Sequence, residues 1–167
     1  STDMARPALF DMDRTLVRRE TASLYVRYQR EIGEATVRDT LQVAVWVAQY
    51  TVGIIDAASV AERALAQFRG THENVLASRC DDWYRRYVDV HVADRARAVV
   101  AAHLAAGDTC AIVTGASRYA ARPLAQALRI PHVVSSELEL DESGVFTGRP
   151  SHPLCFGDGK LERASLL

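Results

Sequence analysis

The sequence has few lysines, few cysteines and no strong excess of charge of either sign. All but one of its 20 basic residues are arginine, and 21 acidic residues bring the formal net charge to −1. Because there is neither a net positive charge nor a basic run, we expect no nucleic-acid partner. Cys80, Cys110 and Cys155 lie far apart without a C-x-x-C pair, which argues against a disulfide framework or a cysteine zinc site. We therefore expect reduced thiols and a cytoplasmic protein.

The sequence also lacks a hydrophobic run long enough to span a membrane. Residues 1–7 are polar and do not contain the apolar stretch of a signal peptide. The longest uncharged run, residues 40–55, includes Gln42 and Gln49 and is shorter than the roughly 18 apolar residues that a spanning helix needs. We expect this run to form a buried helix or the contact of a homodimer, with a membrane-surface helix as the alternative, and we expect no membrane partner.

At 167 residues the chain predicts one domain with room for an insert. The apolar run 8–10 predicts a buried strand that ends at Asp11. Residues 20–91 show only helical patterns, which divide into about four helices. After residue 93, helices alternate with strands, and the last helix is expected over residues 160–167.

The strands expected in this second half cover residues 109–113 and 131–134, with a hairpin over 137–147. Strands that alternate with helices on both sides of a helical block favour a parallel sheet with an insert. We predict an α/β fold in which a Rossmann-like parallel-sheet core carries an inserted helical cap. The core is expected to comprise residues 1–17 and 92–167, and the cap residues 18–91.

Two acids follow the first predicted strand directly, in the run Asp11-Met12-Asp13-Arg14-Thr15. Ligands of open α/β sheets bind beyond the carboxyl ends of the strands. Two crowded carboxylates repel each other, and a divalent cation with hard oxygen ligands, Mg²⁺ above all, relieves that cost. One carboxylate could attack phosphorus while the other moves a proton. A plain turn role for the acids is the structural alternative.

Two further features suit a phosphate group. Thr114-Gly115 follows the strand 109–113, where a hydroxyl can donate to phosphate and a glycine allows close approach of the backbone N–H, although a simple helix entry has the same pattern. Lys160 is the only lysine of the chain and follows a glycine-containing loop. Its ammonium group would offset negative charge that builds up on a phosphate.

Together these motifs resemble the haloacid dehalogenase superfamily, and the chain is most similar to its phosphoserine phosphatase-like subfamily IB. The resemblance implies a C1-type helical cap and a Mg²⁺-dependent phosphatase that hydrolyses a small phosphomonoester through a phosphoaspartyl intermediate. It implies that Asp11 is the nucleophile and Asp13 the general acid and base, and that the Asp11 carboxylate and the Asp13 backbone carbonyl hold the metal. It further implies phosphate binding by four residues: Met12, Thr114, Gly115 and Lys160.

The resemblance also points to two substrate-binding residues. Glu20 stands where the phosphoserine phosphatase-like group has an acid that contacts the amino group of the substrate. An ordinary first-turn acid, favourable to the helix dipole, is an equally good interpretation. Arg14 replaces the small residue usual in phosphoserine phosphatases and would alter the pocket. We therefore expect a small phosphorylated metabolite as partner without naming phosphoserine.

The family's fourth motif, a pair of acids that completes the Mg²⁺ shell, is missing from this pattern. Asp158 with Glu162 could supply it. That assignment would leave no lysine for the third motif, because Lys160 is the only one, so we expect Asp158 to cap a helix. The chain is then expected to stop before the fourth motif. This opens two alternatives, a catalytically impaired phosphate-binding or regulatory member and a phosphotransferase.

Overall fold

Three parallel strands form the central sheet of the computed structural model, which describes residues 5–151. In sheet order they are β1 (Pro7–Phe10), β2 (Thr109–Ser117) and β3 (His132–Ser136). The register places Phe10 beside Ile112 and Ile112 beside Val133, so the carboxyl ends of the strands meet at one edge. The predicted α/β class with a parallel sheet is confirmed.

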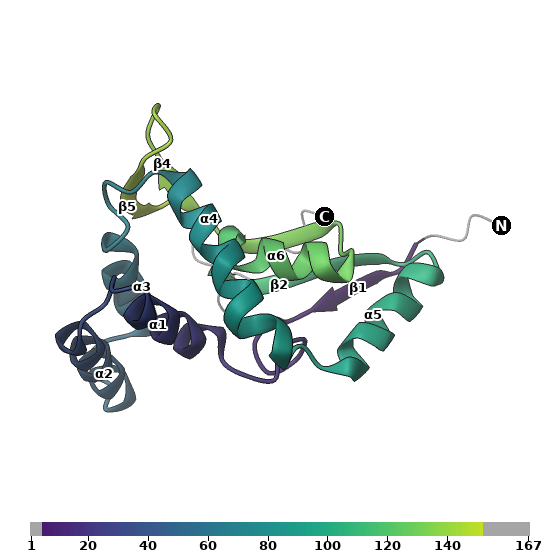
Figure 1. The fold of residues 1–167 in the computed structure, drawn as a ribbon, viewed down its shortest axis with the longest axis horizontal. Coiled ribbons are helices and arrows are strands. Elements are labelled where there is room, and N and C mark those ends of the chain that lie inside the picture. Colours follow the sequence, from purple (N-terminus) through teal and green to yellow (C-terminus); the bar gives the residue numbers. More distant parts are fainter. Residues whose placement is uncertain (1–4, 152–167) are drawn as a thin grey trace.

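Five helices separate β1 from β2, and a sixth separates β2 from β3. Their bounds are α1 (Thr21–Glu31), α2 (Val37–Thr51), α3 (Ala57–Ala66), α4 (Glu73–Trp83), α5 (Asp94–Ala105) and α6 (Arg118–Leu128). A π-helical turn (Tyr84–Val88) and a 3₁₀ turn (Asp89–His91) join α4 to α5. Figure 1 shows α1, α2 and α3 gathered beyond the carboxyl end of β1, while α6 lies along the sheet.

Local side-chain caps explain where several helices begin. Thr36 and Asp39 form a reciprocal capping box at the start of α2, and the Asp56 carboxylate accepts from the backbone N–H of Ser59 at 2.8 Å at the start of α3. Ser117 caps α6 by accepting from the backbone N–H of Ala120 at 3.3 Å. This cap ends β2 and begins α6 at the same residue.

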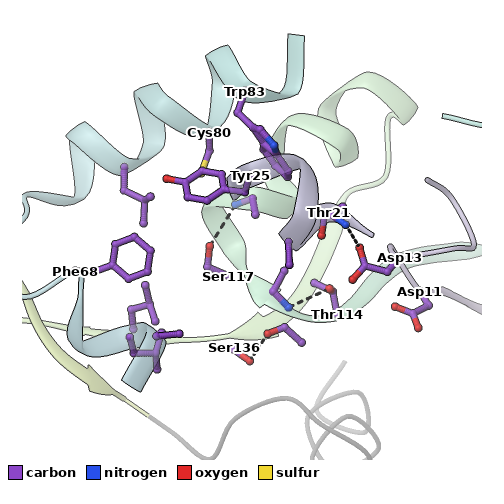
Figure 2. A pocket seen from close by; sticks show the side chains of 18 residues that line it. Asp11, Asp13, Thr21, Tyr25, Phe68, Cys80, Trp83, Thr114, Ser117 and Ser136 are labelled. Carbon is purple, nitrogen blue, oxygen red and sulfur yellow. Dashed lines mark hydrogen bonds between the residues drawn. The ribbon is translucent and has the colours of Figure 1, made fainter. Parts of the chain in front are cut away.

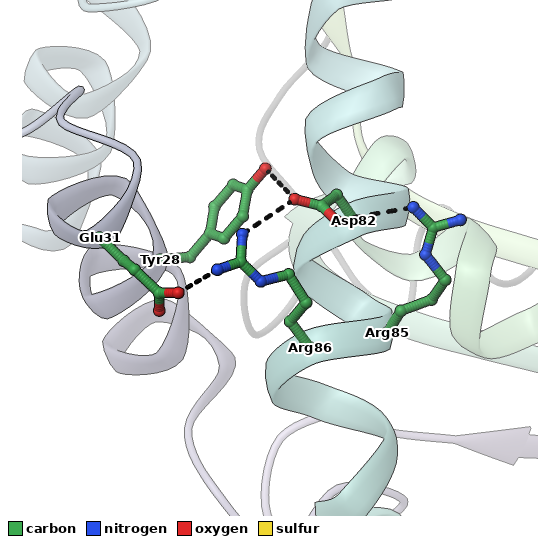
Figure 3. A network of polar contacts seen from close by, with 5 residues as sticks. All are labelled: Tyr28, Glu31, Asp82, Arg85 and Arg86. Atoms are coloured by element: carbon green, nitrogen blue, oxygen red, sulfur yellow. Dashed lines mark hydrogen bonds and ion pairs between the residues drawn. The ribbon is translucent and has the colours of Figure 1, made fainter.

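A polar network holds α1 against α4 and the π-helical turn (Figure 3). The buried Tyr28 hydroxyl donates to the Asp82 carboxylate at 2.9 Å, and Arg86 pairs with both Asp82 and Glu31. Burial and the hydrogen bond to Asp82 raise the pKa of Tyr28 to about 12, so the hydroxyl keeps its proton. Helices from different parts of the insert are thereby held in one arrangement.

The predicted hairpin is present as β4 (Leu138–Leu140) and β5 (Phe146–Pro150), which pair antiparallel. It packs against α3 rather than extending the central sheet. The backbone N–H of Phe146 donates to the carbonyl of Thr71 at 2.8 Å, and that of Gly70 donates to the carbonyl of Phe146 at 3.0 Å. A segment that follows β3 therefore forms part of the helical side of the molecule.

The chain leaves the sheet for the helical block and returns to it at two neighbouring positions. Val17 and Val92 form an isolated antiparallel bridge, with the N–H of Arg18 donating to the carbonyl of His91 at 2.9 Å and that of Ala93 to the carbonyl of Leu16 at 3.1 Å. The division into a core and a cap, with boundaries at residues 18 and 91, stays a prediction, and one hydrophobic cluster contains both Trp83 and Ile112.

The predicted burial of the first strand is wrong. β1 has no second neighbour within residues 5–151, and Leu9 is 50% exposed. For the uncharged run 40–55, the described part of the chain does not form a buried helix, because Leu41 and Val52 of the α2 segment are 62% and 70% exposed. The homodimer contact stays a prediction. Across residues 5–151, no helix combines the length and apolar character needed to cross a bilayer.

Candidate active site

A cavity of about 560 Å³ lies between the carboxyl ends of the strands and helices α1, α3 and α4 (Figure 2). Its two sides differ in chemistry. The polar floor, at the strand ends, consists of Asp11, Asp13, Thr114, Gly115, Ser117 and Ser136. The apolar wall, on the helical side, consists of Tyr25, Leu65, Phe68, Leu76, Trp83 and Leu138. Four of the predicted site residues therefore meet in one cavity, as the strand-end rule requires.

Asp11 is placed by a tight loop directly after β1. Its Oδ1 accepts from the backbone N–H of Met12 at 2.8 Å, and the N–H of Val17 donates to the carbonyl of Met12 at 3.0 Å. The Met12 and Leu16 side chains are buried in the hydrophobic core, while Asp11 is exposed. The buried Met12 and Leu16 side chains thus fix the loop to the core, while the Asp11 carboxylate lines the cavity.

Asp13 is held by the first helix of the insert. Its Oδ1 accepts from the backbone N–H of Thr21 at 2.9 Å, and Thr21 is the buried first residue of α1. A helix N-terminus has unpaired N–H groups and a positive dipole end, so it favours a carboxylate. The orientation of Asp13 therefore depends on the position of α1.

Thr114 and Gly115 belong to the last part of β2. Thr114 is buried, and its Oγ1 accepts from the backbone N–H of Ala116 at 3.1 Å. The carbonyl of Gly115 accepts from the Ser136 hydroxyl at 2.8 Å, which joins the end of β2 to the end of β3. The Thr114 hydroxyl can therefore donate its own proton to a ligand near the N-terminus of α6.

The other predicted site residues have different positions. Arg14 and Glu20 pair with each other through largely exposed side chains and do not line the cavity. The Met12 side chain belongs to the core, so only its backbone lies near the floor. Lys160 lies outside the described residues. The roles of all these residues stay predictions.

Sequence reasoning missed the apolar wall and Ser136. The wall residues come from α1, α3, the turn after α3, α4 and the hairpin, and helical periodicity alone marks them as ordinary core residues. Ser136 ends β3, so the strand-end rule applied to Asp11 and Thr114 could have found it.

Burial keeps the two titratable side chains on the helical side of the cavity neutral. It raises the pKa of the Cys80 thiol to about 12 and that of the Tyr25 hydroxyl well above its ordinary range. Both residues line the cavity. Asp11 and Asp13 are the acidic side chains in the described part of the cavity.

The floor offers oxygen donors that suit a hard cation in kind. Within residues 5–151, however, no group of three or more His, Cys, Asp or Glu side chains is arranged to hold a metal ion. Mg²⁺ in proteins is commonly held by one or two carboxylates, with water and substrate phosphate as further ligands. Asp11 and Asp13 fit such a partial protein shell and do not suit Zn²⁺, which prefers nitrogen and sulfur.

Comparison with known proteins agrees with this geometry. The chain is 27% identical to a protein of unknown function from Bordetella pertussis Tohama I, with a TM-score of 0.88 over 98% of this chain and 74% of the other. A phosphoserine phosphohydrolase-like protein from Francisella tularensis shares the fold at 18% identity and a TM-score of 0.67, covering 98% of this chain and 74% of that one.

Among curated proteins, the chain is 22% identical to a histidinol-phosphatase from Neisseria meningitidis, over 96% of this chain and 72% of the relative. The family model for haloacid dehalogenase-like hydrolases matches residues 8–166. This match covers almost the whole chain and includes both strand-end motifs. The chain therefore belongs to the haloacid dehalogenase-like hydrolase family.

Proposed function

We propose that this chain is a Mg²⁺-dependent phosphatase that hydrolyses a small phosphomonoester with Asp11 as the nucleophile. The observation that carries the proposal is that Asp11, Asp13, Thr114 and Gly115 line one cavity although they come from two distant segments. An acid pair and a phosphate-binding strand end are the parts that phosphoryl transfer to a carboxylate needs. Phosphatases among the relatives support the same reaction class.

In the proposed reaction, the Asp11 carboxylate attacks phosphorus and the ester oxygen leaves. Asp13 donates a proton to that oxygen, so the alcohol departs neutral and a phosphoaspartyl group remains. Asp13 then removes a proton from water, the hydroxide attacks phosphorus, and phosphate and the Asp11 carboxylate are released. Thr114 and the backbone N–H of Gly115 are proposed to bind phosphate oxygens.

The metal would be held by the Asp11 carboxylate and the Asp13 backbone carbonyl, and it would supply a positive charge that lets an anionic phosphate approach the acid pair. Lys160 is proposed to add a second positive charge at the phosphate. The backbone of Met12 is proposed to contribute to phosphate binding through its place beside Asp11. Glu20 and Arg14 keep their proposed substrate-binding role as a hypothesis for direct test.

Phosphate release from a panel that includes O-phosphoserine and histidinol phosphate tests the proposal, with Mg²⁺ and with EDTA. Asp11→Asn should lower turnover by roughly 10³-fold or more, as expected for the loss of a covalent nucleophile. Asp94→Asn is the matched control, because Asp94 is an exposed acid at the start of α5. Wild-type turnover in Asp11→Asn would contradict the proposal.

A binding or regulatory role without turnover is the second candidate. It is favoured by the small number of acids in the described part of the cavity, where only Asp11 and Asp13 occur. Phosphate release by this chain that depends on Mg²⁺ would rule this second role out. Transfer of phosphate to an added alcohol instead of water would identify a phosphotransferase.

A further inference from the structure

We infer that the alcohol part of the substrate is an uncharged apolar or aromatic group rather than an amino acid zwitterion. The inference rests on the proposed phosphatase function and names the substrate class of the same cavity. Figure 2 shows Phe68, Cys80, Tyr25 and Trp83 on the helical side of the cavity, across from Asp11 and Asp13. With its phosphate on the polar floor, a substrate would place its alcohol part against the apolar wall.

The apolar wall offers no charge to pair with a zwitterion. Within residues 5–151, no Arg, Lys, His or Glu side chain lines the cavity. The remaining titratable groups on the helical side, Tyr25 and Cys80, are kept neutral by burial. A carboxylate or ammonium group placed there would lose water without gaining an ionic partner, which costs far more than placing an apolar group.

Charged residues that surround the cavity are already paired elsewhere. Glu20 pairs with Arg14 on the surface, and Glu73 accepts from Arg118 at 3.3 Å and from the Tyr119 hydroxyl at 2.8 Å. None of these five residues lines the cavity. Recruiting one of them to a zwitterion would also cost the existing contact, so these residues are less suited to supply the missing charges than a residue of the wall itself.

The wall also contains aromatic rings that contact each other. The rings of Tyr25 and Trp83 meet edge to face with centroids 5.6 Å apart, and Trp83 is 1% exposed, so its position is set by the core. Edge-to-face and offset contacts with a further aromatic group stabilise beyond the area that they bury. A cavity of about 560 Å³ has room for a phosphate and an attached ring.

Binding of two non-hydrolysable probes to the full chain tests the inference without requiring turnover. We expect 2-phenylethylphosphonate to bind about tenfold more tightly, or better, than 2-amino-3-phosphonopropionate in isothermal titration calorimetry with Mg²⁺, because the zwitterion leaves charges unpaired. In turnover, 2-phenylethyl phosphate should be preferred over both O-phosphoserine and histidinol phosphate by kcat/KM.

A charge added to the wall should weaken this preference. Ala64→Arg places a cation at an exposed, cavity-lining position of α3, and Ala58→Arg adds the same charge on the same helix outside the cavity. Ala64→Arg should narrow the ratio of the two phosphonate affinities by about tenfold, since it offers a partner to the carboxylate. Ala58→Arg should leave the ratio unchanged.

The outcomes separate this inference from the proposed function. Equal or tighter binding of the amino acid phosphonate, a turnover preference for either charged substrate, or no binding of either probe would overturn the inference. The expected binding preference without phosphate release from any substrate would contradict the phosphatase and support the inference about the cavity. A ratio that Ala64→Arg and Ala58→Arg alter equally would also overturn the inference.

Discussion

The backbone N–H of Thr21 donates to Oδ1 of Asp13 at 2.9 Å, which ties the second acid of the motif to the first turn of α1. α1 in turn carries Tyr25 of the apolar wall. One helix therefore positions both the proposed proton-transfer group and part of the surface that would meet the substrate. A shift of α1 would change both together.

Substitution of Asp13 separates its chemical role from its structural one. Asp13→Asn keeps an oxygen that can accept from Thr21, so the free energy of unfolding should change by less than about 1 kcal/mol. Turnover should fall by about 10²- to 10⁴-fold, because proton transfer is lost. Asp13→Ala also removes the acceptor and should lower the free energy of unfolding by a further 1 kcal/mol, approximately. Steady-state kinetics and urea denaturation measure both effects. Full activity in Asp13→Asn would contradict the proposed role.

Arg14 has a left-handed backbone conformation, with φ of 57°. Arg14→Gly should therefore be more stable than Arg14→Ala by about 1 kcal/mol, because both lose the pair with Glu20 and only glycine adopts this φ without a steric cost. Urea denaturation of the two variants measures the difference. Equal stability of the two variants would show that this φ carries no cost.

Glu20→Gln tests the prediction that Glu20 contacts an amino group of the substrate. Because the Arg14–Glu20 pair is exposed, its loss should change the free energy of unfolding by less than about 1 kcal/mol. Glu20 does not line the cavity, so we expect KM for O-phosphoserine to stay the same. A large rise in KM without a change in stability would instead support substrate binding by Glu20.

Phe146 joins the hairpin to both the helical side and α6. Its side chain is 2% exposed, with the Tyr119 ring at 5.6 Å and the Phe68 ring at 6.2 Å between centroids. Phe146→Ala should lower the free energy of unfolding by about 3–5 kcal/mol through lost burial and a cavity. Val90→Ala, at a position 74% exposed, is the control and should change it by less than about 0.5 kcal/mol. Similar losses in both variants would contradict this packing.

Cys80 makes stability depend on pH in the alkaline range. Burial raises the pKa of its thiol from 9.0 to about 12 in the folded chain, so above pH 9 the unfolded chain loses the proton first. The free energy of unfolding should be insensitive to this thiol below pH 9 and should fall as pH rises from 9 toward 12. Urea denaturation between pH 8 and 10 should show a shallower fall for Cys80→Ala. Identical slopes in both proteins would contradict the buried neutral thiol.

Much of the local structure could be predicted because its causes are local. The Asp56 and Ser117 caps, the hairpin turn and the acids after β1 depend on residues next to each other in the chain. Exposure could not be predicted in the same way. Leu9 and Leu41 belong to apolar runs, yet within residues 5–151 they are 50% and 62% exposed. A hydrophobic pattern shows that a face is apolar but does not show which surface packs against it.

The order of helices and strands, the parallel sheet and the places of Asp11 after β1 and of Thr114 in the last part of β2 follow from short stretches of chain, since strand geometry and caps are local. What lies opposite those two residues depends on how distant segments pack. The tertiary structure brought Tyr25, Phe68 and Trp83 together into an apolar wall and left Glu20 paired with Arg14 outside the cavity. Packing between distant segments sets such distances, and no local pattern encodes them.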